Sequence, residues 1–164
     1  MNDSNKTREY WPLISLIIVA VLAGTALCYG VNGGTLEWMH YVMGIFLCQF
    51  SLLKLFDISG FADGFQMYDL IAKRSRTYAL AYPLIELALG LALLSFVYPV
   101  LTYLIIIVVM LIGTISVVKA LREGLDINCP CMGTILNVPL STVTLTEDAG
   151  MGIMALIMLT SRFI

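Results

Sequence analysis

Long apolar runs separated by short polar segments dominate this chain. Each run approaches the length of about 20 residues that an α-helix needs to cross the hydrocarbon core of a bilayer. We therefore predict an all-α integral membrane protein, a helical bundle of four to five transmembrane helices. The predicted spans cover residues 12–29, 38–56, 77–96, 100–118 and 147–162. The last span has the shortest apolar core, which is why the number is given as four to five.

A different pattern marks residues 58–73, between the second and third spans. Apolar side chains recur there at helical spacing, at Ile58, Phe61, Phe65 and Tyr68. Polar side chains take the opposite side, which is typical of an amphipathic helix lying in the membrane interface. Within it, Asp69 and Lys73 have the i,i+4 spacing of a favourable ion pair.

Composition and charge agree with a membrane location. Of 164 residues, 60% are hydrophobic and 12% are charged, with a mean hydropathy of +0.93. Soluble globular domains carry about 25% charged residues. The length suits a single membrane domain over residues 1–164, with the lipid bilayer as its first partner. A net charge of −2 and the lack of a Lys/Arg stripe argue against nucleic acid as a partner.

Three charged residues in or beside the apolar runs are candidate site residues. Glu86 lies about 15 Å along the third span from Arg76, near the bilayer midplane. A carboxyl group there must be protonated, hydrogen-bonded or paired, in either a functional or a structural role. Lys54 and Asp57, at the end of the second span, can pair locally, and the Lys54 side chain can reach the interface.

The remaining polar groups within the spans suggest packing. Cys28 and Cys48 each follow a glycine by four residues, Gly24 and Gly44, and small residues at that spacing let helices approach closely. We interpret both thiols as small apolar groups. His40, near the outer end of the second span, is expected to be an interfacial side chain, with a ligand or proton-relay role as the alternative.

The most distinctive motif is Asn128-Cys129-Pro130-Cys131-Met132-Gly133, in a predicted loop over residues 124–145. Two thiols this close can form a strained, exchangeable disulfide, which predicts thiol–disulfide exchange with a redox partner or client protein. Alternatively, Cys129 and Cys131, with Met132, can bind a soft metal ion such as Cu(I). A third interpretation is purely structural, and no other cofactor is predicted.

The basic residues predict the orientation. With the N-terminus in the cytoplasm, all but Arg162 lie on the cytoplasmic side, namely Lys6, Arg8, Lys54, Lys73, Arg74, Arg76, Lys119 and Arg122. Such a bias in short loops sets the topology of multi-pass proteins. The pattern therefore places the dithiol on the cytoplasmic side of a cell membrane and His40 on the outer side.

Four segments together carry a family resemblance. They are Lys54-Leu55-Phe56-Asp57, the aromatic side of the 58–73 helix, Pro83 to Gly90, and Cys129-Pro130-Cys131-Met132-Gly133. In this order they resemble the MauE/DoxX-like integral membrane proteins, and the C-x-C-x-G segment resembles the MauE branch.

The resemblance implies a bacterial inner-membrane protein associated with redox or disulfide chemistry. In methylamine-utilising bacteria, MauE is linked to maturation or export of the disulfide-rich small subunit of methylamine dehydrogenase. That client is periplasmic, whereas the charge pattern predicts a cytoplasmic dithiol. A shuttle that passes electrons across the bilayer would reconcile the two. Whether the protein is itself an enzyme is left open.

Overall fold

The computed structural model describes residues 3–124 and 140–162, and the regular secondary structure in this part of the chain is all helix, with no strand. The helices are α1 (Asp3–Gly30), α2 (Thr35–Phe56), α3 (Ile58–Tyr68), α4 (Arg76–Leu94), α5 (Pro99–Arg122) and α6 (Leu140–Ser161). Four of them are long and apolar enough to cross a bilayer: α2, α4, α5 and the Trp11–Gly30 part of α1. The prediction of an all-α, multi-pass membrane bundle is confirmed.

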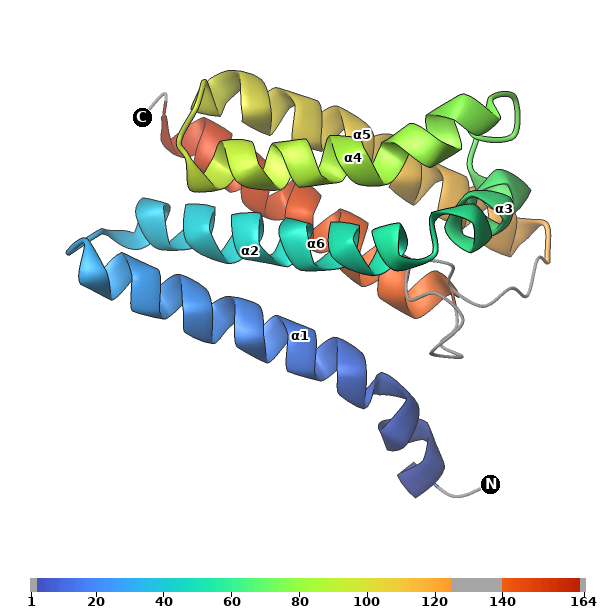
Figure 1. Ribbon diagram of the computed structural model, residues 1–164, viewed down its shortest axis with the longest axis horizontal. Coiled ribbons are helices and arrows are strands. Elements are labelled where there is room, and N and C mark those ends of the chain that lie inside the picture. The colour runs from blue at the N-terminus through green and yellow to red at the C-terminus, as the bar shows by residue number, and fades with distance from the viewer. Residues whose placement is uncertain (1–2, 125–139, 163–164) are drawn as a thin grey trace.

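The long helices run up and down beside one another (Figure 1). Helices α2, α4, α5 and α6 surround the core, with the most extensive contacts between α5 and α6 and between α2 and α4. Helix α1 packs mainly on α2 and diverges from the bundle toward its N-terminus. Only 22% of its most apolar stretch is buried, so most of that surface is left for lipid.

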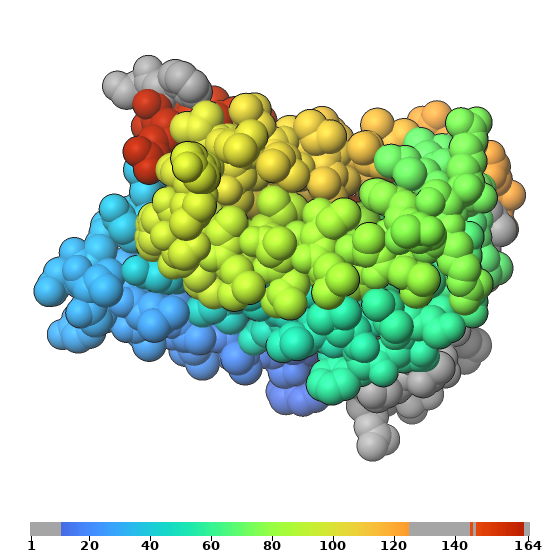
Figure 2. All heavy atoms as spheres, turned by 45° about the horizontal axis from the view of Figure 1, so that its top comes forward, coloured from blue at the N-terminus to red at the C-terminus, as the bar shows by residue number. Residues whose placement is uncertain are grey.

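Helix α3 lies across one end of the bundle, where α2 and α5 end and α4 and α6 begin (Figure 1). We call this the α3 end. In the space-filling view, side chains of α4 cover the front of the bundle between α2 and α5, and α3 closes this end (Figure 2). The buried aromatic side of α3, formed by Phe61, Phe65 and Tyr68, faces the bundle and supplies part of the core at this end.

Small residues set the close approach of the helices. A Cβ atom added at Gly90 on α4 would lie 2.8 Å from the Cys48 sulfur and 3.0 Å from the Gly44 carbonyl oxygen on α2. One added at Gly24 on α1 would lie 2.8 Å from the Val42 backbone nitrogen on α2. These contacts agree with the predicted packing role of the glycines and of Cys48, because any larger residue would push the helices apart.

Two predicted boundaries are wrong. The interfacial helix ends at Tyr68 and not at residue 73, because the Asp69 carboxylate accepts hydrogen bonds from the backbone N–H groups of Ile71 (2.9 Å) and Ala72 (2.8 Å), which favours a turn over another helical turn. The Asp69 side chain is buried in this turn and is held by these hydrogen bonds. The predicted ion pair with Lys73 therefore does not hold it in place. The predicted loop over residues 124–145 ends earlier than residue 145, because α6 already begins at Leu140.

Candidate functional site

The most unusual feature of the interior is a buried ion pair between α2 and α4. Lys54 lies in the last turn of α2, and its Nζ atom is 2.6 Å from both Oε1 and Oε2 of Glu86 on α4. The side chains are 2% and 0% exposed. Contacts of this length to both carboxylate oxygens are charge-assisted hydrogen bonds of the strong kind. Each charge needs the other, because a single buried charge is very costly.

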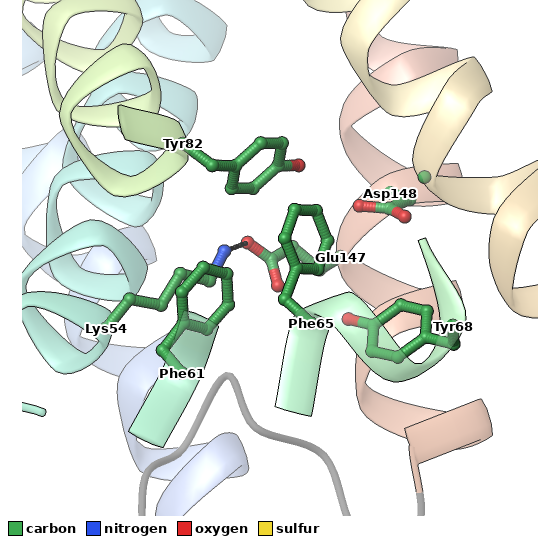
Figure 3. A pocket seen from close by; sticks show the side chains of 8 residues that line it. Lys54, Phe61, Phe65, Tyr68, Tyr82, Glu147 and Asp148 are labelled. Carbon is green, nitrogen blue, oxygen red and sulfur yellow. Dashed lines mark hydrogen bonds and ion pairs between the residues drawn. The ribbon is translucent and has the colours of Figure 1, made fainter. Parts of the chain in front are cut away.

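A second carboxylate reaches the same ammonium from α6. The Oε1 atom of Glu147 lies 3.1 Å from Lys54 Nζ, and the Glu147 side chain is 1% exposed. Lys54 therefore links α2 to both α4 and α6. Its partners Glu86 and Glu147 lie 32 and 93 positions further along the chain. Figure 3 shows the ammonium and the Glu147 carboxylate facing one another across the interior.

Aromatic rings surround the ammonium on its other sides. Lys54 Nζ lies 5.7 Å from the centre of the Phe61 ring and 5.3 Å from that of Tyr82. Both distances are within the range of a cation–π interaction, in which the negative ring face attracts the cation. The Phe65 ring packs against both of these rings. Its centre lies 5.0 Å from the centre of the Phe61 ring and 4.7 Å from that of Tyr82. The rings hold the ammonium away from water and restrict where it can move.

A third carboxyl group, that of Asp148, completes the cluster. The position opposite it on α5 is Gly113, where a Cβ atom would lie 2.3 Å from Asp148 Oδ2. Only glycine at that position leaves room for the carboxyl group. The Asp148 side chain is 3% exposed, and it points toward the Tyr82 hydroxyl (Figure 3).

These groups enclose a small cavity of about 10 Å³. The cavity is lined by Lys54, Phe61, Phe65, Tyr68, Tyr82, Gly113, Glu147 and Asp148. A space of this size holds about one water molecule. We refer to the lining residues together with Glu86 as the Lys54 cluster.

Another buried acid lies beside the cluster but is satisfied separately. Asp69 Oδ2 accepts a hydrogen bond from the Ser116 hydroxyl on α5 (3.0 Å), and the Ser116 oxygen accepts one from the Leu70 backbone N–H (3.2 Å). With the two N–H groups of the turn, this gives the Asp69 carboxylate three donors. Its role is to attach the segment after α3 to α5.

The structure brings together two of the three charged residues singled out from the sequence. Glu86 is paired, as a carboxyl group at that depth has to be. The expected local pairing of Lys54 with Asp57, and the extension of Lys54 to the interface, are wrong. The lysine chain turns inward to two carboxylates, while Asp57 begins α3, where its Oδ1 atom accepts a hydrogen bond from the Gly60 N–H (2.9 Å).

Sequence reasoning missed the two acids on α6. The predicted last span starts at residue 147, which would put both acids at its end, but α6 begins at Leu140 and Glu147 points into the core. A usable signal was present. Glu147 and Asp148 are followed by an uninterrupted stretch without charge to Ser161, so a helix through this segment must bury both acids or expose them to lipid.

The dithiol candidates Cys129 and Cys131, together with Met132, lie outside the described residues. The other two cysteines are free thiols, with Cys28 buried and Cys48 partly buried against α4. Across residues 3–124 and 140–162, no group of three or more His, Cys, Asp or Glu side chains is arranged to hold a metal ion. The α6 residues Met151 and Met158 belong to the apolar core.

Comparison with known proteins gives a family. The family described as "Methylamine utilisation protein MauE" matches residues 32–161, which is most of the chain. The chain belongs to the MauE family. No curated protein and no solved structure matches it. The matched range contains α2 to α6, all the charged residues of the Lys54 cluster and the Cys129–Cys131 segment, whereas α1 lies outside it.

Proposed function

We propose that this MauE-family protein is an accessory protein of methylamine utilisation, in a bacterial inner membrane, that uses Cys129 and Cys131 in thiol–disulfide exchange with a client protein. The observation that carries the proposal is the family match, because it extends through the dithiol segment and into α6. Two thiols separated by one proline are suited to a strained, exchangeable disulfide.

The exchange balances without a further reactant. A client thiolate attacks one sulfur of the Cys129–Cys131 disulfide and forms a mixed disulfide. The second client thiolate then attacks the client sulfur of that bond and releases the reduced dithiol. Two electrons and two protons pass from the client to the dithiol, and the reverse reaction reduces a client disulfide. The relative reduction potentials set the direction.

The flanking helices support an aqueous position for the exchange. Helix α5 ends and α6 begins at the α3 end (Figure 1), so the two helix ends that flank the dithiol segment in sequence both lie there. Lys119, in the last turn of α5, is 54% exposed. A lysine or arginine close to a thiol stabilises the reactive thiolate.

The orientation proposal also rests on this end. Exposed basic residues gather at the α3 end, including Lys73, Arg74, Arg76 and Arg122. We propose that this end faces the cytoplasm, in accord with the usual bias of basic loops. Lys54 adds nothing to that bias, because it is buried and paired.

The test is to trap thiol states in cells that express the full-length protein. Acid quenching followed by a mass-adding thiol reagent reports whether Cys129 and Cys131 cycle between dithiol and disulfide. In Cys131→Ser, the resolving thiol is lost, and we expect Cys129 to accumulate a mixed disulfide with its client. Cys28→Ser is the matched control and should leave the cycling intact.

Two outcomes would overturn the proposal. One is a permanently reduced pair that yields no mixed disulfide in Cys131→Ser. The other is a stoichiometric soft metal in the purified protein that is lost in Cys129→Ser, which would indicate a metal carrier. Labelling of Cys129 by a membrane-impermeant maleimide in intact cells tests the orientation separately, and ready labelling from outside would reverse it.

A further inference from the structure

We propose that the Lys54 cluster is a proton-binding site, in which the neighbouring carboxyl groups of Glu147 and Asp148 hold exchangeable protons. This inference does not depend on the dithiol. It rests on the charge, burial and cavity of the described residues.

The first step is a count of charges. Within the described part of the chain, the ionisable acids and bases of the cluster are the ammonium of Lys54 and the carboxyl groups of Glu86, Glu147 and Asp148. Full ionisation would leave one positive and three negative charges, an excess of two negative charges. All four side chains are at most 3% exposed. An uncompensated charge at this burial is too costly to persist, so the carboxyl groups must take up protons.

The second step is to decide which carboxyl group remains ionised. Both oxygens of Glu86 lie 2.6 Å from Lys54 Nζ, which makes Glu86 the best-stabilised carboxylate. Glu147 makes one contact, at the longer distance of 3.1 Å. Asp148 is its neighbour in the chain, and two adjacent carboxylates repel each other when both are ionised. The protons therefore belong to the Glu147–Asp148 pair.

The surrounding elements offer little further compensation. Helix α2 contributes Lys54, α3 the Tyr68 hydroxyl, and α4 the Tyr82 hydroxyl and Glu86, while α5 faces Asp148 with Gly113. The undescribed segment 125–139 contains no Lys, Arg or His. Positive charge from that segment therefore cannot replace the protons.

The apolar surroundings of Glu147 and Asp148 strengthen the need for protons on these carboxyl groups. Between α1, α2 and α6, Glu147 borders a cavity of about 270 Å³ whose other lining residues carry no charge, among them Ile17, Val42, Phe46 and Met151. Between α5 and α6, Asp148 borders a cavity of about 410 Å³ in which Thr114 is the one other polar side chain. Neither cavity supplies a cation for the carboxyl groups.

The central cavity makes these protons exchangeable. Its volume of about 10 Å³ suits one water molecule, and the hydroxyls of Tyr68 and Tyr82 point toward it together with the Asp148 carboxyl group (Figure 3). Hydroxyl groups donate and accept hydrogen bonds, so they can pass a proton between a water molecule and a carboxyl group. A fully packed carboxylic acid would lack such a neighbour.

The experiment is infrared spectroscopy of the purified full-length protein in lipid vesicles. A protonated carboxyl group has a carbonyl stretch that is separate from the carboxylate bands and shifts in D₂O. We expect such a band in the wild-type protein near neutral pH. It should shift in D₂O and fade as the pH is raised, because deprotonation removes the carbonyl. In the Glu147→Gln/Asp148→Asn double variant the band should be lost.

The controls separate this proposal from folding effects and from the proposed function. Asp63→Asn changes an exposed acid that pairs with Arg76, and should keep the band. The Cys129→Ser/Cys131→Ser double variant should also keep it, whatever the fate of thiol exchange. The D₂O shift is measured on the wild-type protein, so it does not depend on whether a variant folds.

Three results would overturn the proposal. The first is the absence of the band in the wild-type protein. The second is its persistence in a folded Glu147→Gln/Asp148→Asn variant, which would place the proton on another group. The third is its disappearance when sodium replaces choline as the buffer cation, which would mean that a metal ion fills the site instead.

Discussion

Helix α2 carries a buried polar side chain near each of its ends, and the two differ in kind. Lys54 lies at the α3 end, and His40 lies about 21 Å away along the helix axis. Both side chains are 2% exposed. The Lys54 cluster joins charged groups around a cavity, whereas the surroundings of His40 form a compact hydrogen-bonded group.

The His40 ring is held by groups from α4 and α5. Its Nδ1 atom lies 3.2 Å from the Leu93 carbonyl oxygen, which can only accept, so Nδ1 carries the proton. Its Nε2 atom then accepts a hydrogen bond from the Tyr103 hydroxyl on α5. The ring stacks on Phe96, with ring centres 4.4 Å apart. The expectation of an interfacial histidine is wrong, because the ring is enclosed by three other segments.

The difference shows why burial alone does not identify a functional residue. At His40, each ring nitrogen has a partner and no net charge is left over, so the group can be purely structural. In the Lys54 cluster, the acids outnumber the base, and neutrality requires protons whose binding depends on pH. A buried group that needs bound protons, such as the Lys54 cluster, can therefore respond to its surroundings. A buried group whose hydrogen bonds are satisfied, such as His40, is expected not to respond.

The largest effect should come from removing the cation. In Lys54→Met, the Glu86 carboxylate loses its counter-ion within the bundle, and the free energy of unfolding should fall by about 3–5 kcal/mol. Unfolding of the purified protein in detergent by denaturant, followed by circular dichroism, measures this change.

The matched control is Lys119→Met. The Lys119 side chain is 54% exposed, and its Nζ atom lies 3.9 Å from Oε1 of Glu123. Its loss should therefore change the free energy of unfolding by less than about 1 kcal/mol. Adding Glu86→Gln to Lys54→Met should restore part of the lost stability, because a neutral amide no longer needs the ammonium. Equal losses for the two lysines would remove the distinction between the buried and exposed pairs.

The next largest effect concerns the space around Asp148. Gly113→Ala places a methyl group where its nearest neighbour, Asp148 Oδ2, is 2.3 Å away, so the carboxyl group or α5 must shift. We expect a loss of about 1–3 kcal/mol, which is typical of overpacking. Thermal unfolding in the same detergent measures it, and Asp148→Ala in the same chain should relieve it.

Gly152→Ala is the control for helical glycines in general. A Cβ atom there meets Met110 Cβ at 3.7 Å, an ordinary contact, so this variant should be as stable as the wild type or more stable. If Gly113→Ala were equally harmless, the tight placement of Asp148 would be contradicted.

A smaller effect is expected at the other end of α2. Tyr103→Phe removes the donor to His40 Nε2 and should lower the stability by about 1 kcal/mol. The carbonyl stretch assigned to the Lys54 cluster should be unchanged in this variant. Tyr98→Phe, at a residue that is 76% exposed, provides the comparison. A change of the infrared band in Tyr103→Phe would show that the two groups are coupled.

The smallest effect should come from Asp57, which is close to Lys54 in sequence but outside the cluster. Asp57→Ala removes the acceptor for the Gly60 N–H at the start of α3, at a cost of about 0.5 kcal/mol. Asp57→Asn keeps an acceptor and should be nearly neutral. Both are measured by thermal unfolding, and a loss as large as that of Lys54→Met would make Asp57 a member of the cluster after all.

Much of the fold follows from local features of the chain. The length of each apolar run predicts a helix, since a segment in lipid must satisfy its own backbone hydrogen bonds. The prolines and polar residues between the runs place the turns, as at Pro99, the first residue of α5. The need for a partner at Glu86 also follows from the sequence, because the residue is charged and lies deep within a span.

Only the tertiary structure decided which groups meet. Apolar residues surround these helices on the lipid side and on the protein side alike, so no periodic pattern shows which side of a helix faces its neighbours. The inward turn of Lys54, the arrival of Glu147 and Asp148 from α6 and the enclosure of His40 all depend on how each helix is rotated within the bundle. Contacts across 32, 63 and 93 residues fix that rotation, and no local segment contains them.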